Sequence, residues 1–147
     1  MKTGKELKIN SFKNYNVIFG SVNNKHPKAV YINLSSWVQP KVDDEINYNR
    51  VIRDLNKKLK QTLFNHFSKL ENTDIIEERT IVDLDIRESG IRYGKRSFMS
   101  CEITLFLNTE IPVNSEVMKP RLTEIVNVLI EEVFQSNRNF TFNKKKN

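Results

Sequence analysis

The segment Thr80–Leu107 limits the possible folds more than any other part of the chain. Apolar and polar residues alternate along both of its halves, with the period of a half-buried β-strand. A loop, Arg87–Ser97, joins the halves and contains two glycines and four basic residues. The expected inner positions are Val82, Leu84, Ile86, Met99, Cys101, Ile103, Leu105 and Leu107. This spacing predicts an antiparallel hairpin with one face against a core.

Further elements are predicted on both sides of this hairpin. Residues 15–22 and 29–38 are rich in aromatic and β-branched side chains, which indicates an earlier pair of strands. Apolar residues recur every three or four positions through residues 48–70, which predicts a helix. A second helix is expected at about 120–135, with proline tolerated in its first turn. The Phe-Thr-Phe pattern within residues 137–143 is compatible with a short strand.

The resulting order, β-β-α-β-β-α, predicts a single α+β domain. Its simplest architecture is a four-stranded antiparallel sheet with both helices packed on one face. This is a permutation of the ferredoxin-like sandwich, with the last strand moved to the front. We expect residues 14–136 to form the domain, residues 1–13 a flexible basic arm and residues 137–147 a basic tail.

Charge is distributed unevenly along this chain of net charge +6. Residues 1–73 hold 13 Lys and Arg against 6 Asp and Glu, and the remainder holds 11 against 12. Such a surplus is typical of a surface that binds polyanions. It is also the composition that an AT-rich genome favours through its codons.

The single cysteine and the lack of a long apolar run favour a cytoplasmic protein without a membrane segment.

These patterns favour a small, non-catalytic nucleic-acid-binding protein, with single strands a better fit than duplex. The hairpin loop mixes residue types that contact phosphates and stack on bases, although such a loop is also what a solvated hairpin tip requires. The first predicted helix carries a basic stripe on its outer side. The candidate binding residues are Arg87, Arg92, Tyr93, Lys95, Arg96, Arg50, Arg53, Lys57 and Lys60.

A structural or adaptor role is the alternative from a different class. In that case the loop and the chain ends are contact arms in a homo-oligomer or a larger assembly, such as a viral particle or a transcription or replication complex. The strands also carry aromatic residues, of which some must face away from the helices, as at a subunit interface. These residues are Tyr15, Phe19, Tyr31, Trp37, Phe98 and Phe106.

Most enzyme classes have little support, and no cofactor is expected. Asp83, Asp85 and Glu102 fall on one face of the hairpin and are the residues for a metal-dependent nuclease. The Glu-x-Lys of many such nucleases is missing, however, because Thr104 stands two residues after Glu102. One cysteine and two histidines exclude a Cys/His zinc site, and the predicted burial of Cys101 argues against a thiol nucleophile.

Overall fold

The computed structural model describes residues 6–9, 15–22, 28–40, 48–88 and 97–142. The elements in chain order are β1 (Glu6–Ile9), β2 (Asn16–Val22), β3 (Ala29–Pro40), α1 (Tyr48–His66), β4 (Lys69–Leu70), β5 (Thr73–Ile75), the 3-10 turn η1 (Glu77–Arg79), β6 (Ile81–Glu88), β7 (Ser97–Asn108), α2 (Lys119–Leu129), the π-helical turn η3 (Ile130–Phe134) and β8 (Phe140–Phe142). The α+β class and the two predicted helices are confirmed.

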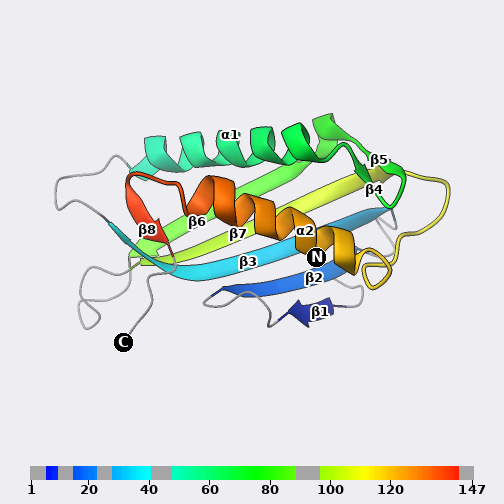
Figure 1. Cartoon of the computed structure of the whole chain (residues 1–147), viewed down its shortest axis with the longest axis horizontal. Coiled ribbons are helices and arrows are strands. Elements are labelled where there is room, and N and C mark those ends of the chain that lie inside the picture. The colour runs from blue at the N-terminus through cyan, green and yellow to red at the C-terminus, as the bar shows by residue number, and fades with distance from the viewer. Residues whose placement is uncertain (1–5, 10–14, 23–27, 41–47, 89–96, 143–147) are drawn as a thin grey trace.

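Strands β3 and β7 form the centre of an antiparallel sheet (Figure 1). Each is 12 residues long, and they pair continuously from Ala29 opposite Phe106 to Val38 opposite Ser97. Strand β2 pairs with the other edge of β3, and β6 pairs with β7. The central order is therefore β2-β3-β7-β6, built from two hairpins.

The prediction of a four-stranded sheet is wrong, since eight strands pair within the described residues. Strand β1 pairs with β2 and lies in the segment expected to be a flexible arm. Strand β8, the predicted Phe-Thr-Phe strand, pairs with the last three residues of β3. Strands β4 and β5 form a short hairpin beside the end of β7. These additions are two to four residues long, too short to produce a periodic pattern.

Both helices cover the same face of the sheet (Figure 1), and their apolar stripes enter one continuous core. Leu55, Leu59 and Leu63 of α1 are almost completely buried, as their helical spacing predicts. Helix α2 buries Leu122, Ile125, Val126 and Leu129. Apolar burial of this kind is the main source of stability in a domain of this size. The opposite face of the sheet, called the far face below, turns away from both helices.

On the far face, Gly20 of β2 lies directly opposite Tyr31 of β3. A Cβ at Gly20 would be 2.1 Å from the Tyr31 ring, and Tyr31 is only 2% exposed. The ring therefore occupies the space that any other residue at position 20 would need.

Substitution Gly20→Ala is expected to displace the Tyr31 ring and lower the free energy of unfolding by about 1–3 kcal/mol. Chemical denaturation followed by circular dichroism measures this loss. Asn16→Ala is the matched control, because Asn16 lies on the same strand and is exposed, and it should change stability by less than about 0.5 kcal/mol. Equal stability of Gly20→Ala and the wild type would show that Tyr31 does not need this space.

Candidate functional site

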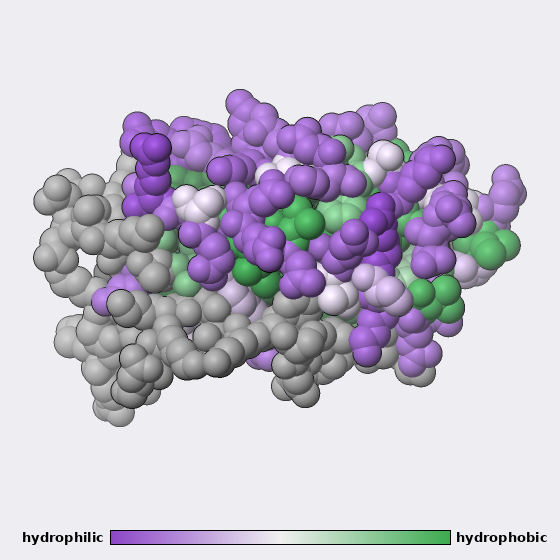
Figure 2. All heavy atoms as spheres, in the orientation of Figure 1, coloured by the Kyte–Doolittle hydropathy of each residue, from purple (hydrophilic) through white to green (hydrophobic). Residues whose placement is uncertain are grey.

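Helix α1 presents a basic surface on the side away from the core. Arg50, Arg53 and Lys57 are exposed, and Lys60 is half-buried. With Lys58 included, α1 carries five Lys and Arg and a single acid, Asp54. At 1.5 Å per residue the stripe Arg50–Lys60 extends about 15 Å. Figure 2 shows hydrophilic side chains along the edge of the molecule that α1 forms.

The predicted loop site is only partly within the described residues. Arg92, Tyr93, Lys95 and Arg96 lie outside them. Arg87, near the end of β6, is highly exposed, and its Nε donates to Asp85 Oδ2 at 2.6 Å. An exposed pair of this kind contributes little to stability, so the Arg87 guanidinium can exchange this partner for a ligand at small cost.

Trp37 and Phe98 form an exposed aromatic pair on the far face. They are direct cross-strand neighbours, their ring centroids are 5.4 Å apart, and the rings meet edge to face at 74°. Their exposed fractions are 38% and 42%. Arg87 lies opposite Phe98 on the next strand. Trp37 and Phe98 together are called the aromatic patch below.

The other aromatic residues singled out from the sequence do not join this patch. Tyr15 and Phe19 belong to the core, and Tyr31 is buried over Gly20. Phe106 is 8% exposed, and the Arg79 guanidinium lies over its ring, 4.2 Å from the centroid. The far face is therefore an aromatic surface only at the end of the sheet where β6 ends and β7 begins.

The three carboxylates of the nuclease hypothesis share the far face, but their neighbours differ. Asp83 lies directly opposite Glu102. Asp85 accepts from Arg87, and Glu102 Oε2 accepts from Asn33 Nδ2 at 2.9 Å. Among the residues that the structure describes, no three His, Cys, Asp or Glu side chains are grouped as a metal site requires. The carboxylates thus give this face a negative charge that Arg87 partly offsets.

Cys101 lies in the middle of β7, opposite Leu34, with no exposed surface. Burial is the main cause that raises the pKa of its thiol to about 12, and the nearby charges of Asp83 and Glu102 contribute to the same shift. Since only the thiolate is a strong nucleophile, this cysteine is suited to packing and not to catalysis.

Cys101 is accordingly expected to resist a chromogenic disulfide reagent at about pH 8 in the native protein. The same reagent should label one thiol per chain in denaturant, which is the positive control. Complete labelling of the native protein within minutes would contradict the buried placement.

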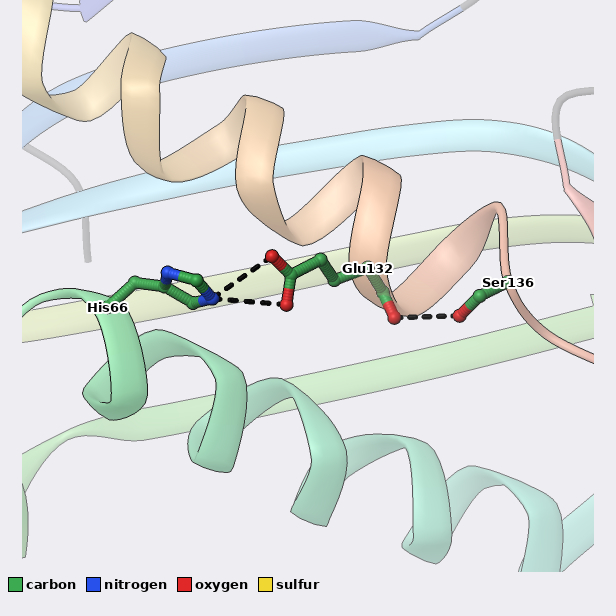
Figure 3. A network of polar contacts seen from close by, with 3 residues as sticks. All are labelled: His66, Glu132 and Ser136. Atoms are coloured by element: carbon green, nitrogen blue, oxygen red, sulfur yellow. Dashed lines mark hydrogen bonds and ion pairs between the residues drawn. The ribbon is translucent and has the colours of Figure 1, made fainter.

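His66 ties the end of α1 to the turn that follows α2 (Figure 3). Its Nε2 lies 3.1 Å from Glu132 Oε1 and 3.0 Å from Oε2. Ser136 Oγ donates to the backbone oxygen of Glu132 at 2.7 Å. These contacts give His66 a structural role at the surface, as a link between two helices. The other histidine, His26, lies outside the described residues.

A polar hollow, which sequence reasoning missed, lies between the end of α1, the β4–β5 hairpin and the start of α2. Its volume is about 450 Å³. It is lined by His66, Ser68, Lys69, Glu71, Asn72 and Arg121. Arg121 is separated from the other five by about 50 positions in the chain, so no local motif could reveal the group. The one local signal is the Glu71-Asn72 turn.

Comparison of the chain with protein-family models, with curated proteins and with solved structures finds no match in any of the three. Within the described residues, neither helix combines the length and the apolar character that crossing a membrane requires.

Proposed function

We propose that this protein binds single-stranded nucleic acid without catalysing a reaction, with the outer face of α1 as its main contact to phosphates. The observation that carries the proposal is the exposed row of Arg50, Arg53 and Lys57 on a helix with five basic residues and one acid. Phosphate contacts by Arg and Lys supply most of the affinity in sequence-independent binding.

The predicted loop residues extend this surface in the proposal. The first turns of α1 lie at the same end of the molecule as the end of β6 and the start of β7 (Figure 1). Arg92, Lys95 and Arg96 add phosphate contacts, and Tyr93 adds a ring on which an unpaired base stacks. The need for unpaired bases is the reason for preferring single strands to duplex. The proposal assigns the protein to the cytoplasm and includes no cofactor or membrane.

In this proposal the domain is a permuted ferredoxin-like unit. The central order β2-β3-β7-β6 and the position of both helices on one face support this interpretation. Strands β1, β4, β5 and β8 are then additions around it. A fold of this class does not by itself imply an activity.

The triple substitution Arg50→Gln, Arg53→Gln, Lys57→Gln is expected to weaken binding to a single-stranded oligonucleotide and to flatten its salt dependence. Loss of three phosphate contacts should reduce the slope of log K against log salt by about 2. Fluorescence anisotropy between about 50 and 200 mM salt measures both quantities.

The matched control is Lys28→Gln, Lys119→Gln, Arg138→Gln, which removes the same charge at exposed positions that are not part of α1. It should leave the slope nearly unchanged. If both triple variants lose the same affinity and slope, the effect belongs to net charge and the α1 surface is not the site.

A role in assembly is the second candidate, and the aromatic patch favours it. Large aromatic residues that lie side by side on an exposed sheet face are typical of the centre of a protein interface. The neighbouring carboxylates repel phosphates, which favours a protein partner or a second copy of the chain on this face.

Replacement of both patch residues, Trp37→Ala and Phe98→Ala, is expected to abolish self-association or partner retention. Size-exclusion chromatography with light scattering measures the mass. The control is Ile111→Ala with Val117→Ala, which removes exposed apolar side chains elsewhere on the surface. A wild-type protein that stays monomeric and retains no partner refutes the assembly role.

A further inference from the structure

Two basic side chains reach the polar hollow from different elements. These are Lys69 and Arg121, and Glu71 is the only acid in the lining. Two further acids lie beside it, because Glu124 pairs with Arg121 and Glu132 with His66. Within the part of the chain that the structure describes, neither the Lys69 ammonium nor the Ser68 hydroxyl has an ionic or hydrogen-bonding partner. These donors border a space of about 450 Å³, which is large enough for a small molecule.

Arg121 is held in place before any ligand arrives. Its guanidinium lies over the Phe67 ring, 4.6 Å from the centroid. One of its terminal nitrogens donates to Glu124 Oε1 at 2.7 Å. A guanidinium has five N–H donors in a planar fork, so this bond leaves others for an oxyanion. A preorganised donor loses less entropy on binding than a mobile one.

The opposite rim of the hollow is a tight hairpin turn. Glu71 and Asn72 both have positive φ, 50° and 67°, the conformation of a two-residue turn between antiparallel strands. Asn72 adopts it readily, whereas it costs Glu71 on the order of 1–2 kcal/mol. The turn joins Leu70 to Thr73, which are paired across the hairpin. The position of Lys69 relative to Asn72 is therefore fixed by the short hairpin.

We propose that the polar hollow binds a single phosphate group, with Arg121 and Lys69 as the charged ligands and Ser68 and Asn72 as neutral donors. Each phosphate oxygen accepts hydrogen bonds, so one group can meet donors that converge from several elements. The polar lining is unsuited to an apolar ligand. The phosphate belongs either to a small molecule or to the end of a nucleic-acid strand. The site does not depend on the α1 basic surface.

Titration of the full chain with inorganic phosphate, followed by amide chemical shifts in NMR spectra, tests the proposal. The wild type should show saturable shifts at residues that line the hollow. Lys69→Gln should weaken this binding at least about tenfold, since a hydrogen bond to a charged group is lost. Arg121→Lys keeps the charge but loses the planar fork, and it should weaken binding as well. Lys119→Gln, in the same helical turn as Arg121 but outside the lining, should bind within about twofold of the wild type.

Two outcomes overturn the proposal: shifts that do not saturate, and equal weakening by Lys69→Gln and Lys119→Gln. A 5′-phosphorylated dinucleotide and its unphosphorylated form distinguish the two sources of the phosphate, a small molecule and the end of a nucleic-acid strand. Tighter binding of the phosphorylated form than of inorganic phosphate identifies a strand end, and equal binding identifies a small phosphate. The variant Arg50→Gln, Arg53→Gln, Lys57→Gln should bind inorganic phosphate like the wild type, so failure of the nucleic-acid proposal leaves this result unchanged.

Discussion

The pairing of β3 with β7 determines which surface of the sheet each other element packs against. In this register Ile32 lies opposite Ile103 and Leu34 opposite Cys101, and all four face the helices. Side chains alternate between the faces of a strand, so a shift by one residue would turn the whole apolar set outward. The ten-residue pairing therefore gives the sheet one apolar face, which both helices must cover, and leaves the far face to the intervening residues.

This one-sided burial separates two surfaces of different chemistry. The outer face of α1 is basic, and the core separates it from the sheet. The far face carries the aromatic patch beside the carboxylates of Asp83, Asp85 and Glu102. A phosphate chain is attracted to the first surface and repelled by much of the second. The two proposals thus assign nucleic acid and a protein partner to separate surfaces, so the two candidate functions are compatible.

The sequence predicted those elements in which a periodic apolar pattern continues over many residues. The alternation in β7 and the apolar spacing in α1 gave their inner residues correctly. The pattern does not predict cross-strand register. It places Trp37 and Phe98 in strands, but it does not reveal that they lie opposite each other. Burial of Tyr31 depends on the missing side chain at Gly20, a contact between strands. The polar hollow needs Arg121 beside the β4–β5 hairpin, which only the packing of α2 provides.

We propose that nucleic acid binds the α1 side of the molecule and not the far face. Amide chemical-shift mapping with a single-stranded oligonucleotide measures this directly. The largest shifts are expected in α1, around Arg53 and Lys57, with small shifts in the middle of β3 and β7. Shifts concentrated at Trp37 and Phe98, with α1 unchanged, would contradict it.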